Sequence, residues 1–297
     1  MPPAGPASAA LTYSVVTVAT DAAHGEALAE WIRGAFGVEP VELQKPGGAR
    51  VWLDSYFEDD VSALLAARVA ERHPLARGVS VRTCRPRDWQ RFWRRHFPVR
   101  RIGRALRIVP VWERAKTPKL RGMQDILVNP GLSFGTGTHF TTAFCLEQIE
   151  AVCREAPPAS LLDVGTGSGI LAIAAAKLGV RHVVATDFDA QALEQARENV
   201  RLNGVALRVE LSVADITSAA PGDRYEVVCA NLFGHLLIRC ADVLVAATGG
   251  ILILSGIREI EADAVAGAFA AHGLEEEVRD GDGEWCGLRF RVAGAGR

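Results

Sequence analysis

The stretch LLDVGTGSGILAIAAAKLGVRHVVATDFD, residues 161–189, decides the fold class of this 297-residue chain. An apolar run ends near Asp163, and a second β-type run, RHVVAT, closes on Asp187. Three glycines and a helix-like apolar run lie between them, the glycines at Gly165, Gly167 and Gly169. The order strand, glycine turn, helix, strand, acidic tip is typical of a parallel α/β sheet that binds a ligand at the turn.

The glycines and Asp187 predict a cofactor that contains adenosine. Glycine lets the backbone turn tightly and approach a ligand closely. Asp187 lies where a carboxylate can accept both ribose hydroxyls. The simpler alternative is a βαβ turn that binds no ligand.

The glycine spacing selects the kind of cofactor. It is G-x-G-x-G, because Ile170 holds the position of the last glycine in a dinucleotide-binding turn. A phosphate-binding G-x-x-x-x-G-K-[ST] sequence is absent. Asp163 would repel a pyrophosphate, but it suits a cationic ligand such as the amino group of S-adenosylmethionine. The acid followed by G-x-G-x-G resembles the first motif of class I methyltransferases, and S-adenosylmethionine is the predicted cofactor.

Composition indicates a folded globular protein of one large or two ordinary domains, with 49% apolar residues. The chain has no apolar run long enough for a membrane span, and its start does not resemble a secretory signal. The six cysteines are scattered and form no metal-binding pattern. We therefore expect a cytoplasmic protein with reduced thiols and no metal.

Charge is unevenly distributed. Residues 81–121 hold twelve Arg and two Lys against Asp88 and Glu113, which gives a local net charge of +12 in a chain whose total is −2. Such a zone can contact nucleic acid, although the predicted function does not require it. The alternative is a solvated helix face, DWQRFWRRHF, that joins two domains.

The first part of the chain predicts a small α+β domain over residues 1–85. Strands are expected over 11–19, 38–43, 51–57 and 79–83, and helices over 22–36 and 61–72. The order βαββαβ favours a ferredoxin-like fold. The domain carries no catalytic constellation, so we interpret it as the substrate-recognition domain.

The remaining chain predicts a linking segment and a larger domain. Residues 86–121 form a basic linker helix (88–98) and a hairpin, RIGRALRIVPVWE. Residues 122–297 form an α/β domain with helices on both faces of a mostly parallel sheet. Its strands are expected over 160–164, 182–186, 208–213, 225–230, 250–256 and 286–292, with a helix over 190–203.

Two further motifs carry candidate site residues. The first, NPGLSFGTGTHFTTAFCLEQI (129–149), reads equally as a ligand-facing loop before a helix or as a structural cap. In the second, VVCANLFGHLL (227–237), Asn231 ends a buried strand and can accept a hydrogen bond from an amine, unless it only forms a turn. Asp215 follows another strand and can reach an adenine amine. His235 is read as a capping or core residue rather than a general base.

Together these motifs resemble one family. The segments GLSFGTGTHFTT, LLDVGTGSGILAIAAAKLG, ATDFDAQALEQARENVRLNG, VCANLFGHLL and EWCGLRF are similar, in this order, to the family that methylates protein eleven of the large ribosomal subunit (PrmA). The resemblance covers about residues 12–293. It implies a Rossmann-like class I methyltransferase domain behind the ferredoxin-like domain, with cofactor contacts at Thr142, Gly165, Asp187 and Asn231. Asp163, Gly167 and Asp215 complete the expected cofactor site.

Two departures from the family pattern lie near the expected amine entrance. Phe140 replaces a usual proline, and Phe233-Gly234-His235 follows the Asn-Leu motif where the family has a small or Asn-Pro pair. Both concern substrate identity rather than cofactor binding.

The resemblance implies methyl transfer to lysine side chains and an N-terminal α-amine of a large-subunit ribosomal protein. Asn231 is expected to orient the amine, and Phe134, Leu232 and Phe233 to wall an apolar mouth that desolvates it. The alternatives are a methyltransferase of the same fold acting on another protein, RNA or a small molecule, and a non-catalytic cofactor-binding protein. A monomer is expected, although the sequence does not fix the oligomeric state.

Overall fold

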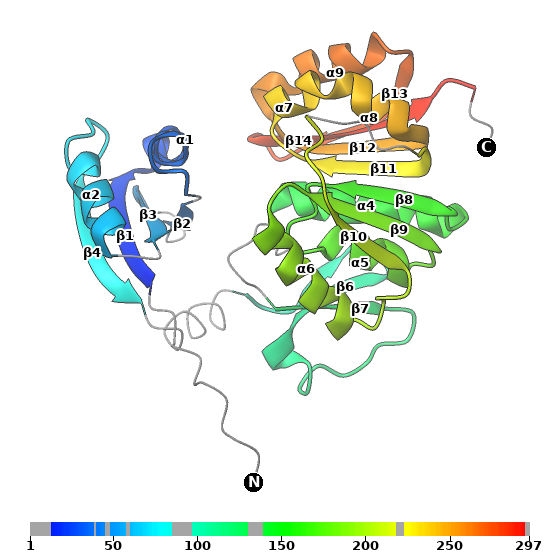
Figure 1. Ribbon diagram of the computed structural model, residues 1–297, viewed down its shortest axis with the longest axis horizontal. Helices are drawn as coiled ribbons and strands as arrows, with labels where there is room; N and C mark the ends of the chain where they lie inside the picture. Colours follow the sequence, from blue (N-terminus) through cyan, green and yellow to red (C-terminus); the bar gives the residue numbers. More distant parts are fainter. Residues whose placement is uncertain are drawn as a thin grey trace. The chain divides into compact units, whose positions relative to one another are not determined.

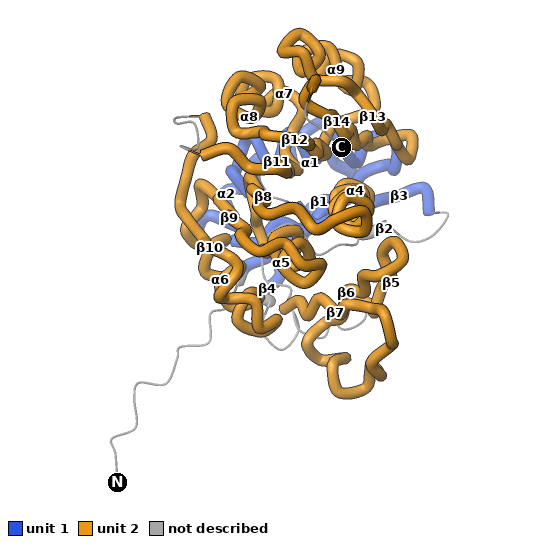
Figure 2. The backbone as a smooth tube through the Cα atoms, turned by 90° about the vertical axis from the view of Figure 1, so that its right-hand side faces the viewer, with its two compact units in different colours: residues 1–96 blue, residues 97–297 orange. Residues whose placement is uncertain are grey.

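A computed structural model describes residues 13–38, 40–44, 48–57, 60–84, 97–129, 139–217 and 223–294 (Figure 1). The chain divides into two compact units, Met1–His96 and Phe97–Arg297, here called the N-terminal and C-terminal units (Figure 2). No helix within the described ranges is long and apolar enough to cross a membrane. Most of the expected linker helix, residues 88–96, lies outside the described residues.

The N-terminal unit follows the order strand, helix, strand, strand, helix, strand. Its elements are β1 (Tyr13–Asp21), η1 (Ala22–His24), α1 (Gly25–Phe36), β2 (Val41–Gln44), β3 (Arg50–Phe57), α2 (Asp60–Ala70) and β4 (Gly78–Cys84). The strands form one sheet in the order β2-β3-β1-β4, and every neighbouring pair is antiparallel. This topology confirms the predicted ferredoxin-like fold.

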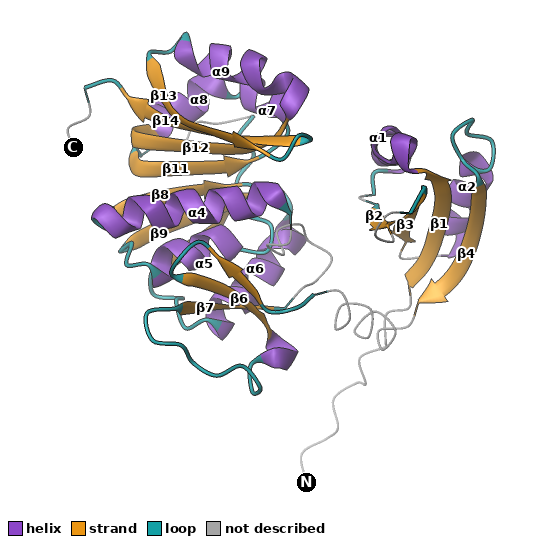
Figure 3. Cartoon of the chain, turned by 180° about the vertical axis from the view of Figure 1, so that it is seen from behind, coloured by secondary structure: helices purple, strands orange, loops and turns teal. Residues whose placement is uncertain are grey.

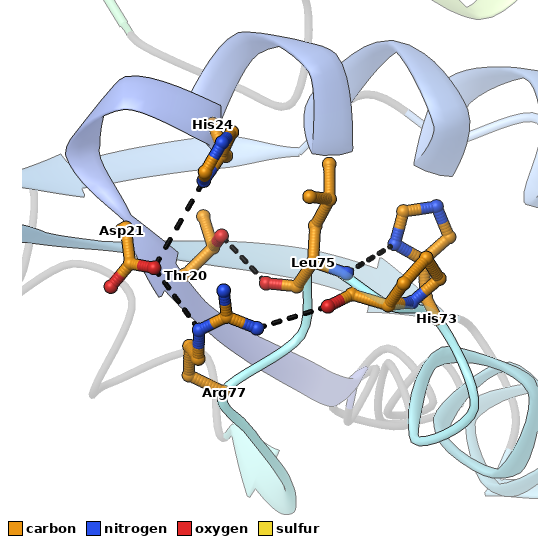
Figure 4. Close-up of polar contacts among 7 residues, drawn as sticks. Thr20, Asp21, His24, His73, Leu75 and Arg77 are labelled. Atoms are coloured by element: carbon orange, nitrogen blue, oxygen red, sulfur yellow. Dashed lines mark hydrogen bonds and ion pairs between the residues drawn. The ribbon is translucent and has the colours of Figure 1, made fainter.

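A polar network fixes the connection between α2 and β4 to the end of β1 (Figure 4). Thr20 Oγ1 donates to Leu75 O at 2.7 Å, and Arg77 Nε donates to Asp21 Oδ2 at 3.0 Å. Leu75 N donates to His73 Nδ1 at 3.3 Å. The histidine and the charged pair are therefore used to hold a turn.

Helix α2 buries small side chains and exposes larger apolar ones. Its alanines face the unit's core: Ala63, Ala66, Ala67 and Ala70 are buried. Its larger aliphatic side chains face outward, with exposed fractions of 68% for Val61, 56% for Leu64, 64% for Leu65 and 48% for Val69. Amphipathic helices usually bury the larger apolar side chains, so α2 leaves an exposed apolar face.

The C-terminal unit is built on a seven-stranded sheet. Its strands are β8 (Ser160–Val164), β9 (His182–Asp187), β10 (Val209–Val213), β11 (Tyr225–Asn231), β12 (Thr248–Arg258), β13 (Leu274–Gly281) and β14 (Trp285–Val292). The order is β10-β9-β8-β11-β12-β14-β13. The first five strands are parallel, and β14 runs antiparallel to both neighbours. The predicted mostly parallel sheet is confirmed, with β13 as an unpredicted edge strand.

Helices cover both faces of this sheet, as predicted (Figure 3). One group is α4 (Phe140–Glu155), α5 (Ile170–Lys177) and α6 (Ala190–Leu202). The other is α7 (Gly234–Arg239), α8 (Ala241–Ala247) and α9 (Ala262–Ala270), with η3 (Glu259–Glu261) before α9. All residues of α5 from Ile170 to Ala176 are buried. A helix that is apolar on every side must be packed against other elements on every side. A second sheet packs against α5 through its strand β7 (Gln124–Val128).

This second sheet contains the predicted hairpin. Its strands, in the order β5-β6-β7, are β5 (Arg100–Ile102), β6 (Leu106–Pro110) and β7 (Gln124–Val128), with η2 (Val111–Glu113) after β6. β5 and β6 are antiparallel, and β6 runs parallel to β7, which packs on α5 and α6. The hairpin was predicted to lie in a separate linking segment, whereas its strand β6 pairs with β7 of the C-terminal unit. This pairing crosses the predicted domain boundary between residues 121 and 122.

Candidate functional site

Three predicted site residues lie at one edge of the large sheet. Asp163 is the next-to-last residue of β8, Asp187 ends β9 and Asn231 ends β11. The three strands are neighbours and parallel, so their carboxyl ends meet at the same edge. Ligands of open α/β sheets bind at this edge.

The glycine turn after β8 is held against this edge. Gly165, Gly167 and Gly169 all have positive φ angles, of 69°, 52° and 81°. These angles lie in the left-handed region that favours glycine. Asp187 Oδ2 accepts from Gly167 N at 2.9 Å, while Oδ1 accepts from Asp189 N at 3.0 Å. Each oxygen of Asp187 retains a lone pair, so the carboxylate can orient the turn and also accept from a diol.

Asp163 is fully buried, with one oxygen satisfied and the other not. Its Oδ2 accepts from Thr166 Oγ1 at 2.6 Å and from Ala172 N at 3.1 Å. Its Oδ1 has no hydrogen-bond partner among the described residues. Burial raises the pKa of Asp163 to about 6, and nearby Asp187 adds to the rise, while the Thr166 and Ala172 hydrogen bonds oppose it. A cationic donor at Oδ1 would remove this cost.

Thr142 provides a second unsatisfied polar atom. It lies in the first turn of α4 and is 1% exposed, and its Oγ1 has no hydrogen-bond partner in the described part of the chain. The helix is capped by His139, whose Nδ1 accepts from Thr141 N at 3.4 Å. Unpaired buried polar atoms are rare, so Thr142 and Asp163 fit a polar ligand. The loop segment 130–138, which includes Phe134, lies outside the described residues.

The residues after Asn231 form the rim of the same edge. A Cβ atom on Gly165 would lie 2.6 Å from Leu232 Cδ2, so Leu232 covers the glycine turn directly. Phe233 is 45% exposed, and its ring stacks with that of His235 at a centroid distance of 6.0 Å. His235 was predicted to be a capping or a core residue, and its exposure excludes the core position.

Asp215 lies just beyond the end of β10. Its Oδ1 accepts from Thr217 N at 2.8 Å and from Thr217 Oγ1 at 2.7 Å, and Ala214 N donates to Asp187 O at 2.9 Å. Asp215 is therefore tied to the same sheet edge as Asp187, with its carboxylate also used in a local turn.

Two residues at this edge were not predicted from the sequence. Thr166 donates to Asp163, and Phe188 exposes 78% of its surface directly after Asp187. Leu232 was predicted as a wall of the amine mouth, but not its packing on Gly165. The available sequence signal for Phe188 was an aromatic residue directly after a strand-end acid. Among the described residues, no group of three or more His, Cys, Asp or Glu side chains could hold a metal ion.

The strand order, the antiparallel β14 between β12 and β13, and the glycine turn between two acids define a class I S-adenosylmethionine-dependent methyltransferase. The sequence profile described as "Ribosomal protein L11 methyltransferase (PrmA)" matches residues 13–293. The chain belongs to this family.

Individual relatives agree with this assignment. The chain is 48% identical over 219 residues to a ribosomal protein L11 methyltransferase of Geobacter sulfurreducens, covering 72% of this chain and 70% of that protein. It is 38% identical over 257 residues to one of Pelobacter propionicus, covering 80% and 81%. The crystal structure of a ribosomal protein L11 methylase from Lactobacillus delbrueckii subsp. bulgaricus aligns with a TM-score of 0.60 and 32% identity, covering 65% of this chain and 98% of that chain.

Proposed function

We propose that this protein transfers methyl groups from S-adenosylmethionine to lysine side chains and the N-terminal α-amine of ribosomal protein L11. The observation that carries the proposal is the sheet edge itself, where a glycine turn lies between buried Asp163 and Asp187 and next to Asn231. The names of the relatives support the substrate. The proposed place of action is the cytoplasm, and the proposed form is a monomer.

The cofactor roles follow from the chemistry of each group. Asp187 accepts from the two ribose hydroxyls, and the unpaired Oδ1 of Asp163 accepts from the cationic amino group. Thr142 Oγ1 is a further polar contact for the amino-acid part. Gly165 and Gly167 let the backbone approach the ligand. Asp215 and exposed Phe188 flank the adenine, one as an acceptor for its amine and one as a stacking surface.

Asn231 is proposed to orient the incoming amine. The sulfonium cofactor supplies an electrophilic methyl group, so the protein's main task is alignment. A lysine amine has a reference pKa of about 10.4 and must lose its proton before it can attack. The apolar rim of Leu232 and Phe233 lowers that pKa by desolvation. The Asn231 side-chain oxygen then accepts a hydrogen bond from the neutral amine and holds it in line with the breaking bond.

Asn231→Ala is expected to lower turnover by more than about tenfold at saturating cofactor and substrate, because misalignment forfeits part of the proximity effect. Cofactor affinity falls as well if Asn231 also contacts the cofactor. Near-normal turnover at saturation would restrict Asn231 to cofactor binding or to shaping the turn.

The function is tested by incubating the full chain with labelled S-adenosylmethionine and purified L11, and by locating the label with mass spectrometry. We expect label on lysine side chains and on the N-terminus of L11. Label on ribosomal RNA with none on L11 would support the alternative methyltransferase. A parallel incubation with L11 already assembled on ribosomal RNA shows which form is the substrate.

Nucleic-acid contact through the basic segment, residues 81–121, is possible, and we propose that methyl transfer does not require it. Part of the segment's charge is structural, since Arg107 is buried and pairs with Asp125 through bonds of 2.7 and 3.0 Å. Arg101, Arg104 and Arg114 are exposed, so their side chains can contact phosphates, although the Arg101 guanidinium also donates to Gly103 O at 3.3 Å and to Arg104 O at 3.2 Å. Replacing these three by Gln should leave the methylation of free L11 unchanged and should weaken salt-sensitive RNA binding if such binding occurs.

A further inference from the structure

Three side-chain amides at intervals of four residues, two in α6 and one on the residue directly after it, project towards β7. Asn203 Oδ1 accepts from Leu127 N at 2.8 Å, and its Nδ2 donates to Leu127 O at 2.6 Å. Asn199 Oδ1 accepts from Asn129 N at 2.9 Å, and Gln195 Nε2 donates to Asn129 O at 3.2 Å. One edge of β7 pairs with β6, so these amides satisfy its other edge in place of a neighbouring strand.

Asn199 makes a further hydrogen bond to a residue outside β7 and α6. Its Nδ2 donates to Ser168 O, within the glycine turn, at 2.9 Å. Both residues are 1% exposed, so water does not compete for the bond. Asn203 differs, because its Nδ2 also donates to Asn199 O of its own helix, at 2.8 Å. Asn199 therefore joins β7 to the cofactor turn, while the Asn203 bonds stay with β7 and α6.

The segment from the end of β9 through helix α6 thus holds the glycine turn at successive points. Just before the helix begins, Asp187 accepts from Gly167 N. Within the helix, Ala196 packs closely against the glycine turn. A Cβ atom added to Gly169 would lie 3.2 Å from the Cβ of Ala196. One turn further on, Asn199 fixes the Ser168 carbonyl. Successive glycines have wide conformational freedom, so their peptide orientations depend on such external bonds.

We propose that Asn199 is a positioning residue of the cofactor site, which sets the orientation of the glycine-turn peptides through Ser168 O without touching the cofactor. The proposal rests on the proposed role of the glycine turn in binding S-adenosylmethionine. The effect expected of Asn199 is a loss of cofactor affinity that is separable from a loss of fold stability, because Asn203 also supports β7 but does not reach the turn.

The test measures S-adenosylmethionine binding by calorimetry, thermal unfolding, and kcat and KM in the full chain. Asn199→Ala is compared with the matched control Asn203→Ala. Asn199→Asp at pH 8 keeps an acceptor for Asn129 N and the original shape, but it lacks the donor for Ser168 O. We expect both Asn199 variants to raise the Kd and the KM for cofactor about tenfold, the effect of one lost buried hydrogen bond, with kcat at saturation nearly unchanged. We expect Asn203→Ala to lower thermal stability to a similar extent and to leave the Kd within about twofold.

The negative charge of the Asn199→Asp variant separates the loss of the donor from a purely electrostatic effect on cofactor binding. A new carboxylate near a cationic cofactor would tighten binding, so weaker binding points to the lost donor bond. An unchanged Kd in both Asn199 variants, with normal binding by the wild-type chain, would overturn this inference alone. An equal rise in Kd for Asn203→Ala would overturn it too, since β7 packing would then explain the effect. Absence of binding by the wild-type chain would overturn the proposed function as well.

Discussion

At the scale of single residues, the carboxylate of Asp187 combines an observed structural role with a proposed role in cofactor binding. It holds Gly167 and Asp189 through its two oxygens, and it is proposed to accept from the ribose. Asp187→Ala should weaken S-adenosylmethionine binding by about 1–3 kcal/mol, the range for leaving buried polar partners unpaired. Calorimetry measures this directly, and an unchanged dissociation constant would remove Asp187 from the site.

The proposed contact between Asp163 and the cofactor predicts that cofactor binding depends on pH. The pKa of Asp163 is about 6 in the protein, raised by burial, so it is protonated below pH 6 and cannot then attract a cationic amino group. Affinity for S-adenosylmethionine should therefore rise as pH increases from 5 to 7 and then level off. Binding should also release a proton near pH 6, which calorimetry in buffers of different ionisation enthalpy detects. A flat affinity profile over this range would argue against the contact.

The same raised pKa has a consequence for stability. Because the folded state holds the Asp163 proton more tightly than the unfolded chain, this group lowers stability as pH rises through 4 to 6. Asp163→Asn should raise the unfolding temperature of the ligand-free protein at pH 7.5 while weakening cofactor binding. This difference in unfolding temperature between the variant and the wild-type protein should become smaller towards pH 4, where Asp163 itself is protonated. A stability gain that is independent of pH would show that ionisation is not its cause.

The sequence predicted those site residues whose type and position in the chain both indicated a ligand-binding role. Acids and an amide at strand ends, next to a glycine turn, were predictable, and the structure brings Asp163, Asp187 and Asn231 to one edge. Leu232 was expected as a wall of the amine mouth, but its contact with Gly165 depends on how β8 and β11 lie side by side. Asn199 gave no signal, because an Asn within a helix is usually a solvated residue.

At the scale of elements, the glycine turn and the segment after β11 form one packed unit. Gly165 has a φ of 69°, and a Cβ there would lie 2.6 Å from Leu232 Cδ2. Gly165→Ala should cost about 1–3 kcal/mol of stability and weaken cofactor binding, through both backbone strain and the clash. Adding Leu232→Ala should relieve only the clash, so a double-mutant cycle should show a favourable coupling energy. Additive effects would show that Leu232 does not press on the turn.

Elements were predicted where apolar runs are long and buried. The parallel strands β8 and β11 were found because their residues are mostly buried on both faces, and β9 was found because its apolar run alternates buried with half-buried residues. Strand β13, LEEEVRDG, was missed because it is an exposed edge whose acids pair across to β14, as Glu277 does with Arg289 at 3.2 Å. Strand β7 was missed because five residues, QDILV, carry little pattern and one of its edges is completed by side chains of α6.

At the scale of the whole molecule, two units with separate cores suit a division of labour. The N-terminal unit is proposed to select the substrate, and the C-terminal unit to hold the cofactor. The exposed aliphatic face of α2 supports the first part, because large apolar patches mark interaction sites. Residues 97–297 alone should bind S-adenosylmethionine yet lose methylation of L11. Full L11 methylation by this fragment would refute the division.

A sharper test keeps the chain intact. Replacing Leu64 and Leu65 of α2 by Glu changes side chains that are 56% and 64% exposed, so the fold should survive with little loss of stability. We expect the KM for L11 to rise about tenfold or more, because the apolar contact is lost, with the Kd for S-adenosylmethionine unchanged. The matched control is Leu207→Glu in the C-terminal unit, where the leucine is fully exposed and both constants should stay at wild-type values. A normal KM in the α2 variant would move substrate selection to another surface of the protein, and an equal rise in the Leu207 variant would point to added negative charge as the cause.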